Sequence, residues 1–324
     1  IASVTENVKT MYRKTLKEAT QQEIYQAVSL LVSDGKVLDT IRLEADSRNG
    51  LAARLDPMAG AVDELLARSG LSSASLGGIA LAFPGIVDVR NARALGTNAK
   101  YDDAPGVDLK AWAGEHWNVG LAMDNDARMA TVGEWLYGAG KGCGQMVMMT
   151  IGTGIGTGVV LDGRLLYGRN FCAGSLGGHI IVDYKGRRCS CGNIGCVEAQ
   201  GSSFFLPRII QELDGVSAGF AQDSDNWNFR TLFAKYRDGD PDAETVVRSC
   251  MDVWSAGIIN YIHAYDPEIV VMGGGIMGSA DIILPYVRKK VEAFAWQPGG
   301  KVGIVASELG DNAALLAAEY YFRK

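Results

Sequence analysis

The chain has 324 residues, of which 48% are hydrophobic and 21% are charged, and its net charge is −6 at neutral pH. This length suits two domains of ordinary size, and the composition is typical of a folded globular protein. No run of about 18 apolar residues occurs, which argues against a membrane partner. The acidic balance without a block of Lys and Arg argues against a nucleic-acid partner, whose phosphates need neutralising. The first residues lack the features of an export signal, so we expect a cytoplasmic protein.

The first third of the chain predicts one helix, a hairpin, a second helix and a buried strand. Residues 3–26 are polar and free of Pro and Gly, which predicts a helix with a thin apolar face. Residues 27–45 predict two strands joined by an Asp-Gly turn. A helix is expected over about 58–69, and the run GGIALAFPGIVD at 77–88 predicts a buried strand.

The rest of the chain alternates strands and helices, which is typical of the α/β class. The expected elements are a strand running into a helix at 120–138, two β-rich arms around a glycine turn at 145–168, a mostly helical region at 202–265, strands within 267–279 and 301–307, and a closing helix at 311–324.

Four residues near the middle of the chain are spaced like the ligands of one structural zinc ion. They are His179, Cys189, Cys191 and Cys196, the last three within a segment rich in turn glycines. Three thiolates and one imidazole satisfy tetrahedral Zn²⁺ without an open position for substrate. Chance clustering of cysteines is the alternative. A disulfide fits less well, because the other three cysteines are scattered and no export signal is present.

A second candidate site is Asp124-Asn125-Asp126, which follows a short apolar strand and precedes a helix. A carboxylate at a strand end can accept the proton of an attacking hydroxyl, and a neighbouring amide can orient that hydroxyl. The same residues are also preferred as a helix N-cap, so both interpretations stay open.

Two glycine-rich turns are candidates for close contact with phosphate. Between Thr150 and Gly158 every second residue is Gly, and Thr153 adds a hydroxyl, so that backbone N–H groups could converge on an anion. Gly273, Gly274 and Gly275 follow another strand. A tight hairpin or a helix-entry turn without ligand is the alternative in each case.

Together these motifs resemble the ROK family of sugar kinases and regulators, a branch of the actin-like ATPase superfamily. The resemblance extends from about residue 28 to residue 323. It is carried by FPGIVD, DNDARMATVGE, TIGTGIGTG, DGRLLYG, GGH with CSCGNIGCVE, IVVMGGG and GDNAALLAA.

The resemblance implies an α/β fold of two actin-like, ribonuclease H-like lobes around a central cleft. The N-terminal lobe would comprise residues 1–120 plus 304–324, and the C-terminal lobe residues 121–303 with the zinc-binding insertion. It also implies a homodimer.

The family's functional residues map onto this chain by motif. Asp126 would be the general base, and the sugar would meet Asn98, Asn125, His179 and Glu198. ATP phosphates would contact Thr150, Gly152, Thr153, Gly154 and Gly156, and the adenosine would lie near Gly273, Gly274 and Gly275. Zinc closure of the loop would hold Glu198 in one place, and Mg²⁺ would accompany ATP.

The chain departs from the family pattern in two places. Family kinases carry a D-x-G-G-T phosphate turn where this chain has residues 21–26, and no glycine precedes Gly35. The usual A-G-E-I-G-H is A-G-S-L-G-G-H here, so that Ser175 or Leu176 replaces the expected Glu.

Two functions are therefore weighed. The first is an ATP-dependent kinase for a hexose or N-acetylhexosamine, and the second is a sugar-binding protein without kinase activity. A DNA-binding repressor is the weaker variant of the second, because only some 25 residues precede the first expected strand and they are not strongly basic.

Overall fold

The computed structural model describes residues 2–8, 25–33, 35–97 and 100–322. The strands that it describes are β1 Ala2–Val8, β2 Tyr25–Ser33, β3 Lys36–Glu44, β4 Ile79–Phe83, β5 Ile86–Asp88, β6 Arg93–Gly96, β7 Leu121–Asn125, β8 Met146–Ile151, β9 Ile155–Leu161, β10 Arg164–Leu165, β11 Ile269–Gly273 and β12 Gly303–Ala306. The α-helices are α1 Ala52–Arg68, α2 Leu109–Trp117, α3 Asp126–Tyr137, α4 Val197–Gly201, α5 Leu206–Glu212, α6 Ala218–Gln222, α7 Phe229–Arg237, α8 Pro241–Tyr265, α9 Ala280–Phe294 and α10 Ala313–Leu316.

Two five-stranded sheets organise the molecule, and both have the same pattern. The first has the order β3-β2-β1-β4-β7 and the second β10-β9-β8-β11-β12. In each sheet three antiparallel strands are followed by two strands that run parallel to the third. The chain thus forms one supersecondary unit twice, which is the α/β arrangement predicted for two related lobes.

The prediction of a helix over residues 3–26 is wrong where the structure describes that segment. Residues 2–8 form β1, which lies between β2 and β4 and pairs with both. Residues 25 and 26 begin β2, and residues 9–24 lie outside the described chain. Long-range pairing on both sides overrides the weak helical pattern. Of residues 21–26, where the family's phosphate turn was expected, 25 and 26 belong to β2 and the rest lie outside the described residues.

The other predicted elements are present with shifted ends. The hairpin at 27–45 is formed by β2 and β3, the helix predicted at 58–69 begins six residues earlier as α1, and the long helix α8 ends the helical region at Tyr265. The closing helix is a single α-helical turn, α10, between two 3-10 segments. The Asp240 side chain caps α8 by accepting from the Ala243 N–H, and Pro241 follows at the first position, where no N–H is needed.

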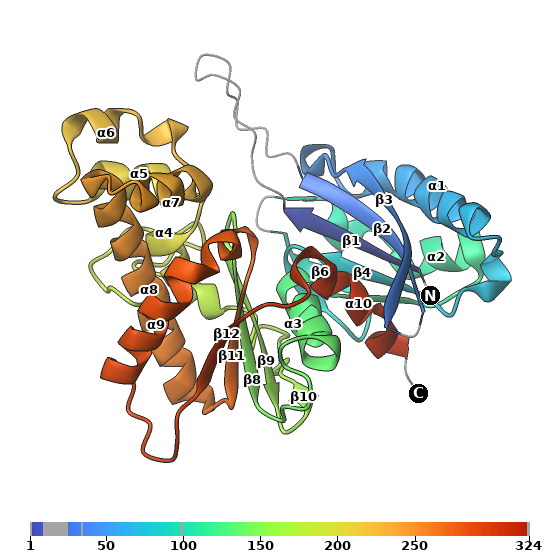
Figure 1. Ribbon diagram of the computed structural model, residues 1–324. Coiled ribbons are helices and arrows are strands. Elements are labelled where there is room, and N and C mark those ends of the chain that lie inside the picture. The colour runs from blue at the N-terminus through green and yellow to red at the C-terminus, as the bar shows by residue number, and fades with distance from the viewer. Residues whose placement is uncertain (1, 9–24, 34, 98–99, 323–324) are drawn as a thin grey trace.

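Helices α3 and α10 lie between the two sheets, whereas α1 and α2 flank the first sheet and α8 and α9 the second (Figure 1). Each lobe has its own apolar core, and a third apolar cluster joins them through β4, α3, β8 and α10. We propose lobe boundaries slightly later than residues 120/121 and 303/304, because β7 (121–125) pairs with the first sheet and β12 (303–306) with the second. No helix among the described residues is long and apolar enough to cross a bilayer.

Candidate active site

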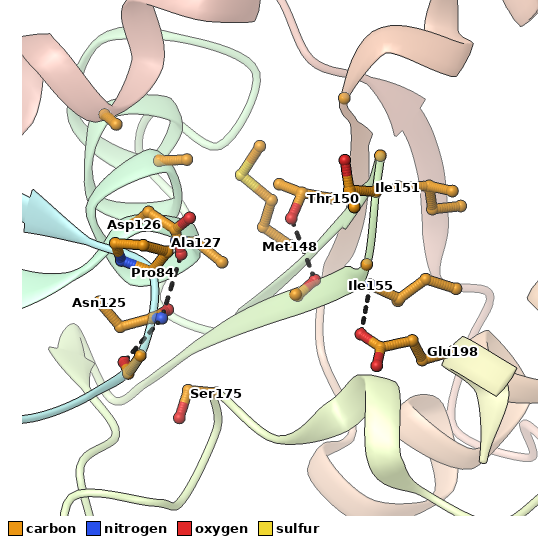
Figure 2. A pocket seen from close by; sticks show the side chains of 18 of the residues that line it. Pro84, Asn125, Asp126, Ala127, Met148, Thr150, Ile151, Ile155, Ser175 and Glu198 are labelled. Carbon is orange, nitrogen blue, oxygen red and sulfur yellow. Dashed lines mark hydrogen bonds between the residues drawn. The ribbon is translucent and has the colours of Figure 1, made fainter. Parts of the chain in front are cut away.

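A cavity of about 490 Å³ opens where the two sheets face each other, and most of the predicted site residues line it (Figure 2). The loops that follow β4, β7, β8 and β11 all reach it, as expected for strand ends in α/β folds. The lining residues that the sequence predicted are Asn125, Asp126, Thr150, Gly152, Thr153, Gly154, Gly156, His179, Cys191, Glu198, Gly274 and Gly275.

Asp126 is the first residue of α3, directly after β7. Its Oδ1 accepts hydrogen bonds from the Ala127 N–H at 2.8 Å and from the Asn125 side chain at 3.1 Å. Asn125 is also the N-cap of α3, since its side chain accepts from the Arg128 N–H. Burial raises the pKa of Asp126, while these hydrogen bonds and the charge of Lys100 act in the opposite direction. The N-cap interpretation is confirmed for Asn125, and both Asn125 and Asp126 line the cavity, while the role of Asp126 as a base stays a prediction.

Asp124 does not reach the cavity, because its side chain is fully buried behind β7. It forms an ion pair of 3.2 Å with Arg128, which is also fully buried, and accepts from the Tyr167 hydroxyl at 2.9 Å and the Tyr321 hydroxyl at 2.8 Å. Burial and the nearby carboxylate raise the pKa of Tyr321, so that both tyrosines are neutral donors. This buried cluster fixes the strand end that carries Asn125 and Asp126.

The same Arg128 guanidinium holds the loop in which the family's Glu is replaced. Its Nη2 donates to the carbonyls of Phe171 and Ala173 at 2.6 and 3.0 Å, and to Ser175 Oγ at 3.1 Å. Ser175 is buried, while Leu176 is partly exposed and lines the cavity. Arg128 therefore fixes the backbone of this loop and contacts the Ser175 hydroxyl directly.

The turn of the glycine loop is narrower than the sequence pattern suggests. Only residues 152–154 form the turn, and Gly156 belongs to β9, where Thr150 Oγ1 donates to its carbonyl. Facing this turn, Gly274 has φ +94°, and a Cβ there would come within 2.2 Å of the Ile151 carbonyl oxygen. Two backbone segments therefore approach closely at the cavity, which a larger side chain at Gly274 would prevent.

Glu198 reaches the cavity from the second residue of α4. Its Oε2 accepts from the Ile155 N–H at 2.9 Å, and its Oε1 accepts from Ser190 Oγ at 3.3 Å (Figure 2). The carboxylate is buried and accepts hydrogen bonds from two different segments.

The four predicted metal ligands lie together, with their ligand atoms within 4.8 Å of one another. Cys189 Sγ is 3.6 Å from His179 Nδ1, and Cys191 Sγ is 3.7 Å from Cys196 Sγ. These two pairs form opposite edges of a tetrahedron, whose edges measure about 3.8 Å when Zn–S is about 2.3 Å. The donor set and its spacing therefore fit zinc.

Two of the residues predicted to contact sugar or nucleotide are not placed at the cavity. Asn98 lies outside the described residues, and Gly273 ends β11 without lining the cavity. Gly310 and Asp311 line the cavity but were not predicted as site residues, although the GDN motif after β12 was a usable signal. Arg128 was not predicted either.

The repeated sheet pattern, the cavity between the lobes and the cysteine-rich loop define an actin-like two-lobed protein of the kind found in sugar kinases. The sequence profile of the ROK family matches residues 25–324. A glucokinase of Thermotoga maritima is 30% identical over 298 residues, which cover 90% of this chain and 92% of the relative. The solved structure of a ROK hexokinase from Thermus thermophilus has a TM-score of 0.71 and 26% identity, covering 92% and 93% of the two chains. The chain belongs to the ROK family.

Repressors are also among its relatives. The xylose repressor of Bacillus spizizenii is 26% identical to this chain over 263 residues. The match covers 79% of this chain and 63% of the repressor.

Proposed function

We propose that the protein is a sugar kinase, which transfers the γ-phosphate of ATP to a hydroxyl of a hexose or N-acetylhexosamine. The observation that carries the proposal is the assembly of a carboxylate at a helix start, a second fixed carboxylate and two close-packed glycine turns around one cavity. The glucokinase relative, which this chain matches over nine tenths of its length, supports the same function.

Asp126 is suited to the role of general base. Burial moves its pKa up from 3.8, toward values at which a carboxylate accepts a proton more readily. In the reaction the sugar hydroxyl gives its proton to Asp126, its oxygen bonds to the γ-phosphorus, and ADP leaves with the electrons of the broken P–O bond. Asn125 is fixed by the Gly85 carbonyl, which accepts from its side-chain amide at 3.1 Å, so it can orient the hydroxyl.

Glu198 and His179 are proposed to bind the sugar on the opposite wall. The His179 Nδ1 atom lies beside Cys189, so with zinc bound its Nε2 carries the proton and can donate to a sugar hydroxyl. Zinc would be structural, holding the loop that ends at Glu198. Asn98 stays a predicted sugar ligand.

The nucleotide is proposed to lie along the two glycine turns. Thr150, Gly152, Thr153, Gly154 and Gly156 would contact its phosphates. Gly273, Gly274 and Gly275 would lie near the adenosine. Mg²⁺, when bound with ATP, would neutralise phosphate charge. A homodimer and a cytoplasmic location stay predictions.

A coupled assay of ADP release over a panel of hexoses and N-acetylhexosamines tests the proposal. We expect Asp126→Asn to lower kcat at least about a hundredfold while the sugar affinity changes little, because general-base catalysis contributes factors of that size. If no sugar supports turnover above this variant, the protein is not a kinase of these sugars.

A second candidate is a sugar-binding protein that has lost ATP binding. It is favoured by the absence of glycine before Gly35, since phosphate turns need close backbone approach. Calorimetry separates the two candidates: sugar binding at micromolar concentration without any nucleotide binding would support the second.

A further inference from the structure

The geometry points to the metal loop as the support of the glycine turn: we propose that occupancy of the His179–Cys196 metal site sets the conformation of residues 152–155 and, through it, nucleotide affinity. The inference rests on the proposed function only where nucleotide binding is measured.

Segment 198–204, which lies just beyond the last metal ligand, is hydrogen-bonded to two residues of the turn and to Ile155, the first residue of β9. Glu198 Oε2 accepts from the Ile155 N–H at 2.9 Å. The Ser203 N–H donates to the Gly152 carbonyl and the Phe204 N–H to the Thr153 carbonyl, each at 3.0 Å. The segment after Cys196 therefore holds the turn in place through hydrogen bonds along its length.

Residues 174–182, which contain His179, also pack against the β8–β9 hairpin. This segment and the segment after Cys196 are the two arms of the metal site. The Gly177 N–H donates to Thr157 Oγ1 at 2.9 Å, and Thr157 Oγ1 donates to the Gly174 carbonyl at 2.7 Å. At Gly178, next to His179, a Cβ would lie 1.9 Å from the Ile155 carbonyl oxygen. Both arms thus lie directly against β9 and its turn.

Apart from the metal site, the two arms are joined by backbone hydrogen bonds and by the side chains of Gln200 and Asp183, the amide of Gln200 donating to the Asp183 carboxylate at 3.4 Å. The Val197 N–H donates to the Ile180 carbonyl at 3.0 Å, and the Val182 N–H donates to the Gly195 carbonyl at 2.9 Å. Between them lie residues 183–195, a stretch of turns and isolated bridges that contains no helix of its own. Short loops of this kind order when a metal closes them. Metal loss should therefore free segment 198–204, and with it the turn.

Gly154 provides a way to disturb the hydrogen bond between Glu198 and Ile155 from the side of the turn. A Cβ at this position would lie 2.5 Å from Glu198 Oε2, inside the closest normal approach. Gly154→Ala should displace the carboxylate even with metal bound. Gly219→Ala is the control, because a Cβ there has no neighbour within 4 Å and the residue lies in α6, outside the cavity.

Amide hydrogen exchange of the full-length protein, with and without a zinc chelator, tests the inference. We expect exchange of the Ile155, Ser203 and Phe204 amides to rise at least about tenfold on metal removal, while α8 and β4 keep their protection. Glu198→Ala should raise exchange at Ile155 in the zinc-loaded protein. Gln200→Ala, on the same helix but bonded to Arg187, should not. Unchanged exchange at Ile155 in the metal-free protein would overturn the inference.

Calorimetry with a non-hydrolysable ATP analogue completes the test. Nucleotide affinity should fall at least about tenfold on metal removal and in Gly154→Ala, but not in Gly219→Ala. Equal affinity with and without zinc contradicts the inference. No nucleotide binding even with zinc contradicts the kinase proposal instead, and the exchange data then decide the structural coupling alone.

Discussion

Two walls of the same cavity are held in place by different interactions. The Asp126 wall consists of β7 and the start of α3, and behind it lies the fully buried Asp124–Arg128 ion pair with its tyrosine donors. The Glu198 wall consists of the glycine turn, the metal loop and α4, which are joined mainly by backbone hydrogen bonds. Under our proposals the folded chain alone would position the base, whereas the sugar and phosphate contacts on the other wall would depend on a bound metal.

Arg128→Met gives the largest expected effect and tests the Asp126 wall. Removing the cation leaves Asp124 charged and buried without its partner, so we expect the free energy of unfolding to fall by about 3–5 kcal/mol. Urea denaturation measures it. Arg68→Met is the control, because the Arg68–Asp39 pair is exposed and its loss should cost no more than about 1 kcal/mol. Similar losses for both variants would mean that the buried pair does not hold this wall.

Metal removal tests the Glu198 wall. We expect Cys191→Ser, or treatment with a chelator, to lower sugar affinity at least about a hundredfold while most secondary structure is retained, since the loop that presents Glu198 loses its closure. Calorimetry and circular dichroism measure the two quantities. Cys143→Ser is the matched control, as Cys143 lies outside the cluster. Unchanged sugar affinity in the metal-free protein would remove the difference between the walls.

The pH dependence of catalysis should report the Asp126 wall. Burial raises the pKa of Asp126 above 3.8, so Asp126 becomes protonated already at a pH above that value. As the pH falls further, kcat/KM should decline by at most about tenfold per pH unit. The folded state then binds a proton more tightly than the unfolded state. The contribution of Asp126 to the free energy of unfolding is thus fully present below pH 3.8. It is lost as the pH rises through the pKa that Asp126 has in the folded state.

Comparison with Asp126→Asn separates this effect from other titrations. The variant should be more stable than the wild type above the folded pKa of Asp126, and the difference should vanish near pH 3.8. An identical pH dependence of unfolding in both proteins would show that Asp126 titrates normally.

Tyr321→Phe gives the smallest expected effect. It removes one of the hydroxyl donors to Asp124 and should lower the free energy of unfolding by about 1 kcal/mol, because Tyr167 still donates. Tyr320→Phe is the control, since the Tyr320 hydroxyl makes no hydrogen bond within the part of the chain that the structure describes. Equal changes in thermal denaturation would indicate that the aromatic rings, not the hydroxyl, support this wall.

The sequence predicted the Glu198 wall better than the Asp126 wall. Cysteine spacing is a local signal, and His179, Cys189, Cys191 and Cys196 are found together as their spacing implies. Asp124 and Asp126 look alike in sequence, but one side chain points into the core and the other toward the cavity. That difference depends on Tyr321, about 200 residues away, which no local pattern could reveal. The spacing of Asp124 and Arg128 by four residues was the one local clue.

The fold was predictable wherever hydrophobic periodicity was strong. The β2–β3 hairpin and the β7–α3 unit followed from their own residues. Strand β1 did not, because its residues are mostly polar and it is a strand only through pairing with β2 and β4.

The contact between Tyr321 and Asp124 also sets an order of assembly during synthesis. Asp124 and Arg128 leave the ribosome within four residues of each other and can pair while α3 forms, but Tyr321 follows 197 residues after Asp124. At about 5–20 residues per second, that interval lasts about 10–40 s. For that time Asp124 can have its ion pair and the Tyr167 hydroxyl but not the Tyr321 hydroxyl, so the last element that the structure describes is needed to complete the lobe that was made first.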